Sequence, residues 1–140
     1  MPVELIILPE RGLVVVRYSG KVTIEDTLFA TKSYLSHPEY SAGQKQLVDM
    51  SGITGFEKDH VQFMKMQAEK AERLANSGLQ SLVVYIAPTA ISQDLSAMFV
   101  RSWIDVDAVV PLVQHFEAEA LGLLGQSEKT IDILLATFAR

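Results

Sequence analysis

Residues 47–61 have the sequence LVDMSGITGFEKDHV, in which an apolar run is followed by a Ser-Gly-Ile-Thr-Gly turn and then by charged residues. The apolar run belongs to a predicted short strand over residues 45–50, and residues 51–55 are expected to form a loop. Residues 57–76 contain no Gly or Pro and are rich in Ala, Glu, Lys, Gln and Met, which favours a long helix. The stretch therefore predicts a strand, a loop and a helix in succession.

The chain after this helix continues the alternation of strands and helices. Residues 79–87 (LQSLVVYIA) are apolar enough to predict a strand inside the sheet. Residues 92–104 predict an amphipathic helix, and residues 109–116 predict a last strand. Pro111 places this last strand at a sheet edge, because proline has no N–H to donate to a neighbouring strand. Two further helices are expected, over residues 117–124 and 129–139.

The N-terminal part predicts a β-hairpin followed by a helix. Residues 3–8 and 13–18 are short runs rich in Val, Ile and Leu, and the four residues between them are typical of a turn. Thr23, with Asp26 three residues later, is close to a capping box and predicts a helix start. Pro38 predicts the end of that helix, since the residue before a proline disfavours the α conformation.

The order of these elements predicts an α/β fold of a single domain. Its mixed sheet has four or five strands, and the crossover helices lie mainly on one face. We expect residues 1–125 to form this domain and residues 126–140 to form an extra C-terminal amphipathic helix, packed on the domain or on a partner. A chain of 140 residues is long enough to fold around its own core without a disulfide or a metal.

The composition argues against several classes of protein. The sequence has no cysteine, which excludes disulfides, thiol catalysis and thiolate metal sites. The net charge of −5 argues against binding to nucleic acid or to an anionic membrane. No apolar run approaches the about 20 residues of a membrane span, and the N-terminus lacks the pattern of a signal peptide. We therefore expect a cytoplasmic protein, and we expect no cofactor.

Two stretches resemble the SpoIIAA-like, or STAS-like, domains. Residues 18–35 (YSGKVTIEDTLFATKSYL) are similar to the family's strand, glycine and acidic helix start. The other stretch looks like the first half of the Asp-x-Ser-Gly-Val-Thr junction of anti-sigma-factor antagonists, through Asp49, Ser51, Gly52, Ile53 and Thr54. The resemblance covers roughly residues 1–125, and it implies the SpoIIAA-like fold and a regulatory or protein-binding role.

The second half of that junction departs from the family. Glu57, Lys58, Asp59 and His60 stand where the family has Asp, the phosphorylated Ser, Ser or Thr, and Gly. No hydroxyl remains at the phospho-acceptor position, so the resemblance implies the fold without the phosphorylation switch. The carboxylate of Asp59 is expected to keep a fixed negative charge at the helix start, where the helix dipole favours it.

The leading hypothesis is a non-enzymatic regulatory or protein-interaction module. It would dock another protein, or its own copy as a two-fold dimer, through the loop 49–56 and the helix 57–76. The helix has one apolar stripe through Val61 and Met64 that is expected to cover the sheet. Phe63 and Met66 lie off this stripe and are expected at an interface, or else under the C-terminal helix. The candidate contact residues are Asp49, Ser51, Thr54, Phe56, Lys58, Asp59, Phe63 and Met66.

Two alternatives remain open. The first is a carrier of a small apolar ligand, with a pocket between the sheet and the helix 92–104. The second is an unrecognised enzyme that uses His60 with Glu57 or Asp59, since Glu57 and His60 are three residues apart and can share a helix face. A solvated, charged helix start explains the same residues, and the sequence shows no further converging ligands that a metal site would need.

Overall fold

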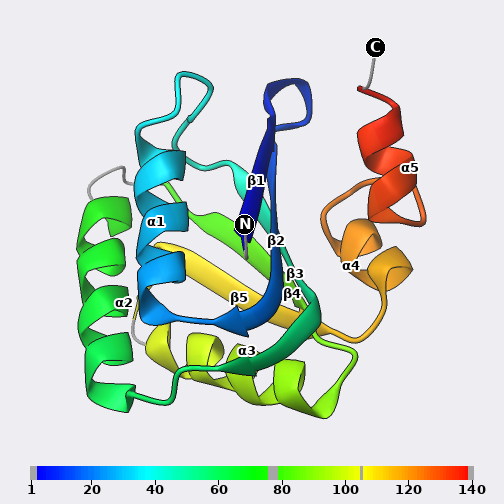
Figure 1. The fold of residues 1–140 in the computed structure, drawn as a ribbon. Helices are drawn as coiled ribbons and strands as arrows, with labels where there is room; N and C mark the ends of the chain where they lie inside the picture. Colours follow the sequence, from blue (N-terminus) through cyan, green and yellow to red (C-terminus); the bar gives the residue numbers. More distant parts are fainter. Residues whose placement is uncertain (1–2, 76–78, 105, 139–140) are drawn as a thin grey trace.

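The computed structural model describes residues 3–75, 79–104 and 106–138 and contains a five-stranded mixed sheet (Figure 1). The strands follow one another across the sheet in chain order, as β1 (Val3–Leu8), β2 (Leu13–Val22), β3 (Lys45–Phe56), β4 (Ser81–Ile86) and β5 (Val109–Gln114). β1 is antiparallel to β2, and the other neighbours are parallel. The predicted α/β class and mixed sheet are confirmed.

The predicted hairpin is present at the N-terminus. Its strands pair from Val3 with Tyr18 to Leu8 with Leu13. The turn is a short 3-10 helix, η1 (Pro9–Arg11), followed by Gly12 with a φ of 60°. A left-handed residue at this place suits glycine, which has no Cβ to clash with the backbone.

Strands β2 and β3 are both longer than the sequence predicts. β2 continues past residue 18 to Val22, and β3 continues to Phe56, so the expected loop over residues 51–55 is part of a strand. Ser19 pairs with Gly52 and Val22 with Phe56, across two irregularities in the register. The loop prediction was wrong because each of these glycine-containing segments supplies the other's hydrogen-bond partner, which local turn propensity does not reveal.

The crossover helices α1 (Ile24–Leu35), α2 (His60–Ala75) and α3 (Ala90–Ser102) lie on the same side of the sheet (Figure 1). The capping box at the start of α1 is confirmed, because Thr23 and Asp26 exchange hydrogen bonds. These helices and the sheet enclose the larger apolar core. The predicted placement of the crossover helices mainly on one face is therefore confirmed.

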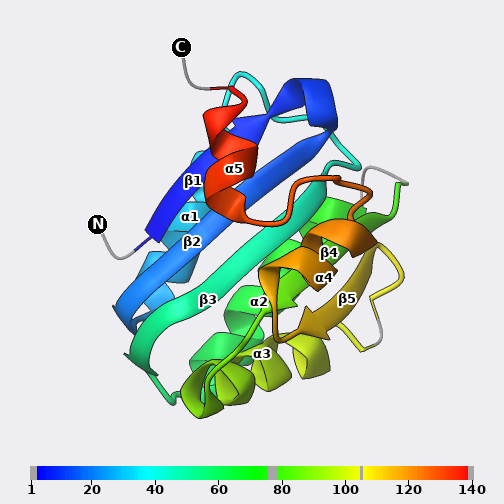
Figure 2. The same cartoon turned by 90° about the vertical axis from the view of Figure 1, so that its right-hand side faces the viewer.

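The opposite face of the sheet carries α4 (Glu117–Leu123) and α5 (Ile131–Ala136) (Figure 2). Ile131 and Leu134 of α5 are fully buried in a second apolar cluster with residues of β2, β3 and β4. Arg11 of the hairpin holds this C-terminal segment through two hydrogen bonds to the carboxylate of Glu128, of 2.9 and 2.8 Å. Side chains alternate between the two faces of the sheet along each strand, so the strands contribute residues to two separate apolar cores.

β5 lies at the edge of the sheet, as Pro111 predicts. β4 lies between β3 and β5, which agrees with its apolar sequence. Helix α2 begins at His60 rather than at residue 57, and the carboxylate of Asp59 accepts a hydrogen bond of 3.1 Å from the backbone N–H of Gln62. The predicted end of this helix, at residue 76, lies outside the described residues.

The orientation of α2 is the reverse of the sequence prediction. Phe63 and Met66 are each only 3% exposed, whereas Val61 is 65% exposed and Met64 is 49% exposed. Phe63 packs edge-to-face on Phe99 of α3, with ring centroids 5.0 Å apart. The expectation that Phe63 and Met66 lie at an interface was therefore wrong.

The physical reason for this error lies in two polar residues on the buried face of α2. Phe63, Met66, Gln67 and Lys70 follow one another at i, i+3, i+4 and i+7, which is the spacing of a single helix face. Gln67 is buried and donates a hydrogen bond of 2.7 Å to Ser102 of α3. Because Gln67 and Lys70 interrupt the apolar pattern, the opposite stripe looked like the buried one.

Candidate functional site

The structure separates the sequence-predicted contact residues by their exposure. The side chains at the surface are those of Ser51, Thr54, Lys58 and Asp59, and the buried ones are those of Asp49, Phe56, Phe63 and Met66. Asp49 accepts hydrogen bonds from the backbone N–H and the hydroxyl of Ser51, at 3.0 and 2.7 Å. It also lies 3.5 Å from the guanidinium of Arg17. Asp49 is thus occupied by intramolecular contacts, which is a structural role rather than the expected surface role.

The residues of the enzyme hypothesis are engaged elsewhere. Glu57 accepts a hydrogen bond of 3.2 Å from the backbone N–H of Ile24 and so helps to cap α1. Asp59 caps the start of α2 through Gln62. The side chain of His60 lies outside the described part of the structure. Both carboxylates of this hypothesis therefore have a local structural explanation.

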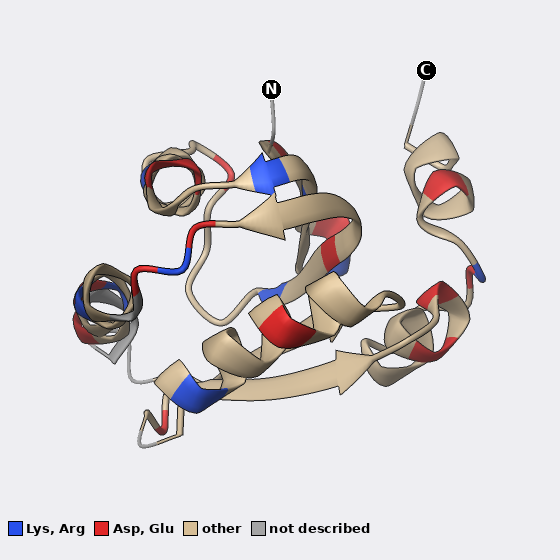
Figure 3. Cartoon of the chain, turned by 60° about the horizontal axis from the view of Figure 1, so that its bottom comes forward, with Lys and Arg blue, Asp and Glu red and all other residues tan. Residues whose placement is uncertain are grey.

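A shallow groove lies between the end of β3 and helix α3. It encloses about 480 Å³ and is lined by Phe56, Lys58, Asp94, Ala97, Met98 and Arg101. The ammonium of Lys58 lies 5.8 Å from the centre of the Phe56 ring, which is within the range of a cation–π contact. Figure 3 shows charges of both signs on α3 and on the segment between β3 and α2. The groove thus combines an apolar floor with cations.

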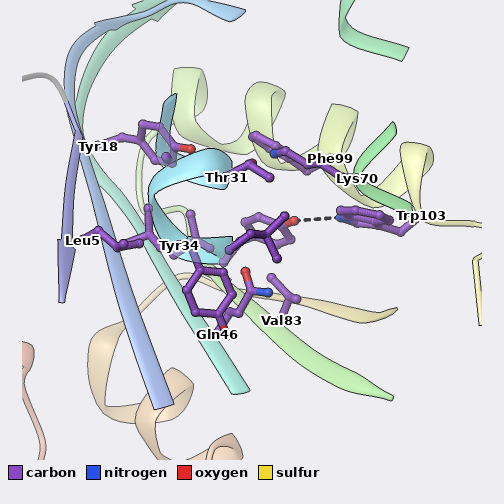
Figure 4. Close-up of a pocket in the computed structure, with 14 residues that line it drawn as sticks. Leu5, Tyr18, Thr31, Tyr34, Gln46, Lys70, Val83, Phe99 and Trp103 are labelled. Atoms are coloured by element: carbon purple, nitrogen blue, oxygen red, sulfur yellow. Dashed lines mark hydrogen bonds between the residues drawn. The ribbon is translucent and has the colours of Figure 1, made fainter. Parts of the chain in front are cut away.

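A second hollow lies between the sheet and helices α1, α2 and α3 (Figure 4). It is a cavity of about 70 Å³, partly open to solvent. Its walls come from four strands and three helices, through Leu5, Val16, Tyr18, Ala30, Thr31, Tyr34, Leu35, Gln46, Val48, Lys70, Val83, Tyr85, Phe99 and Trp103. Phe99 and Trp103 belong to residues 92–104. The cavity therefore lies where the sequence predicts a pocket for a small ligand, between the sheet and this helix.

The aromatic walls of the cavity are held in fixed positions. Tyr85 stacks on Phe99 with ring centroids 5.3 Å apart. The indole Nε1–H of Trp103 donates a hydrogen bond of 3.0 Å to the hydroxyl of Tyr85. Burial raises the pKa of Tyr18 and of Tyr85 above the ordinary value of tyrosine, so both phenols stay neutral at physiological pH.

Lys70 brings a cation to this cavity. Its ammonium lies 5.6 Å from the centre of the Phe99 ring, and Figure 4 shows the side chain beside that ring. Burial lowers the pKa of Lys70 to about 8, because an apolar environment disfavours the charged form. No carboxylate of residues 3–75, 79–104 or 106–138 forms an ion pair with it. Sequence reasoning missed Lys70, although its spacing from Phe63 and Met66 was the available signal.

Among the described residues, no group of three or more His, Asp or Glu side chains is arranged to hold a metal ion. Within the same part of the chain, no helix is both long and apolar enough to cross a membrane.

Comparison with known proteins gives matches in structure. No protein-family model matches the sequence, and no curated protein matches it either. An uncharacterized protein of the DUF3478 family from Shewanella loihica, described as having a SpoIIAA-like fold, is similar with a TM-score of 0.55. The two sequences are 16% identical, over 87% of this chain and 91% of that one.

A second similar structure is the anti-sigma factor antagonist SpoIIAA in its unphosphorylated form. The TM-score is 0.50 at 11% sequence identity, over 88% of this chain and 97% of SpoIIAA. At these identities the likeness concerns the fold, and both structures agree on it. The chain has a SpoIIAA-like fold.

Proposed function

We propose that this protein is a non-enzymatic, STAS-like regulatory module that docks another protein through the groove between β3 and α3. The observation that carries the proposal is the groove itself, in which the largely buried Phe56 and Met98 form the floor and the exposed Lys58 and Arg101 provide cations. The exposed charged residues steer the partner and set its register, and the floor adds apolar contact only where its atoms reach the groove.

The fold supports this proposal by analogy. One structure of similar fold is an anti-sigma factor antagonist, which is a regulatory protein by its description. Folds host many functions, so the argument from the site carries more weight than the analogy. The groove includes Phe56 and Lys58, which are two of the candidate contact residues proposed from the sequence.

The expected partner presents an acidic segment next to apolar side chains. Lys58 and Arg101 are both exposed and would meet the acidic groups, whereas Asp94 would disfavour a purely acidic partner and thereby set the register. Phe63 and Met66 do not line this groove, and both are buried in the core.

The test is a comparison of three variants in an extract of the source organism. The tagged wild-type chain, Arg101→Glu and Lys65→Glu would be used to recover partners, which mass spectrometry identifies. Lys65 is an exposed lysine on α2 outside the groove, so it is the matched control. We expect one protein to be recovered by the wild type and Lys65→Glu and lost with Arg101→Glu.

Two results would contradict the docking proposal. One is a partner that Arg101→Glu retains as well as the wild type does. The other is a chain that recovers no partner and is monomeric by size-exclusion chromatography with light scattering, because the groove would then have no occupant.

A second candidate function is the binding of a small, mainly apolar molecule. The cavity of about 70 Å³ between the sheet and α3 favours it, because its walls are mostly apolar and aromatic. A native mass spectrum of the purified protein would reveal a co-purified molecule as an added mass, and denaturation should release that mass.

A further inference from the structure

We propose that the cavity between the sheet and helices α1, α2 and α3 binds a short-chain monocarboxylate, whose carboxylate pairs with the ammonium of Lys70. This inference rests on the second candidate function and goes beyond it, since it names the charge and the size of the ligand. It does not depend on the docking groove.

The position of Lys70 carries the first part of the argument. Lys70 is a half-buried residue of α2, at i+7 from the buried Phe63, and it lines the cavity. Even partial burial of a cation against apolar walls carries a desolvation cost, which an anionic partner offsets. Its described contact is the face of Phe99, which leaves the three N–H donors of the ammonium without a carboxylate partner among the described residues. An anionic ligand would complete this incomplete ion pair.

Neutral hydroxyls supply the second part of the argument. Tyr18 and Tyr85 both line the cavity. The oxygen of Tyr85 accepts from Trp103, and its own proton has no acceptor in the described part of the chain. Tyr18 likewise forms no side-chain hydrogen bond with a described residue. Two phenol donors and an ammonium that line the same cavity suit a carboxylate, which accepts several hydrogen bonds at once.

The size and the lining of the cavity determine the length and the polarity of the ligand's remaining part. A volume of about 70 Å³ holds roughly five to seven positions of water size, by a scale of about 10–15 Å³ for each water. The ligand is therefore a chain of about four or five carbons rather than a long acyl chain or a nucleotide. Lys70 is the single cationic side chain among the described residues that line the cavity, which favours a ligand with one negative charge. Apolar walls such as Val83 and Phe99 favour a saturated hydrocarbon tail.

The experiment titrates pentanoate and its neutral analogue 1-pentanol against the full chain and follows tryptophan fluorescence. Trp103 is the single tryptophan of the sequence and lines the cavity, so the signal reports on this site. We expect saturable binding of pentanoate to the wild type. Lys70→Met, which keeps an apolar stem but removes the charge, should weaken pentanoate binding at least tenfold. Lys65→Met removes an exposed lysine of the same helix and should leave the affinity unchanged.

The neutral analogue distinguishes charge pairing with Lys70 from simple binding in an apolar site. The wild type should bind pentanoate more tightly than 1-pentanol, and this comparison needs no variant that could fail to fold. Equal affinity of the wild type for both probes, or full affinity of Lys70→Met for pentanoate, would overturn the role of Lys70 while leaving an apolar site. Absence of binding by both probes would overturn the cavity as a small-molecule site altogether.

Discussion

Replacing Phe63 by alanine tests the orientation of α2 directly. Phe63 is 3% exposed and packs edge-to-face on Phe99. Truncation of a buried phenylalanine costs about 3–5 kcal/mol, of which the aromatic pair accounts for about 0.5–1.5 kcal/mol. A domain of this size has a total stability of about 5–15 kcal/mol, so the variant should lose about a fifth of it or more.

The assay is urea unfolding followed by circular dichroism. With a slope of about 2 kcal/mol per molar urea, a loss of about 4 kcal/mol lowers the midpoint by about 2 M. Met64→Ala is the matched control, because Met64 is the next residue and is half exposed. Its stability should stay within about 0.5 kcal/mol of the wild type. Equal midpoint shifts for the two variants would refute the burial of Phe63 and return it to the surface.

Three further predictions concern contacts elsewhere in the fold. Thr89→Ala removes the cap of α3 and should lower the free energy of unfolding by about 1 kcal/mol in urea, and an unchanged midpoint would contradict the capping box. Tyr85→Phe leaves the buried Nε1–H of Trp103 without its acceptor and should cost about 1–3 kcal/mol in the same assay, whereas a neutral effect would mean that the bond contributes nothing. Arg11 lowers the pKa of Glu128 to about 2, so the pair stabilises the fold above the ordinary pKa of 4.5 and loses this effect as the pH falls toward 2. Glu128→Gln should therefore melt below the wild type at pH 7, with melting curves that converge as the pH falls from 4.5 toward 2, and a gap independent of pH would contradict the ion pair.

The docking hypothesis shows where a sequence pattern reaches its limit. Helical periodicity on α2 identified two faces that carry apolar residues, but it could not say which face meets the sheet. The face with Gln67 and Lys70 looked less apolar, yet Gln67 finds a partner in Ser102 and Lys70 finds the ring of Phe99. Both partners lie on α3, about thirty residues further along the chain. Only the packed structure brings these partners to α2.

The sequence indicated the position of the cavity but not the side chains that line it. The sequence indicated a pocket between the sheet and the 92–104 helix, and the structure has a cavity there. The tyrosines, the tryptophan and the lysine that line it come from elements spread over most of the chain. Their convergence depends on the strand order and on the register of the sheet, which local sequence does not contain.

The sequence by itself determined the elements that local chemistry dictates. These are the hairpin with Gly12, the helix capped by Thr23, the inner strand β4 and the edge strand with Pro111. Tertiary structure alone decided the continuation of β2 and β3 through their glycines, the buried face of α2 and the cation in the cavity. The reason is physical: capping and turn preferences act between neighbours in sequence, whereas strand pairing and burial depend on groups that meet only when the chain has folded.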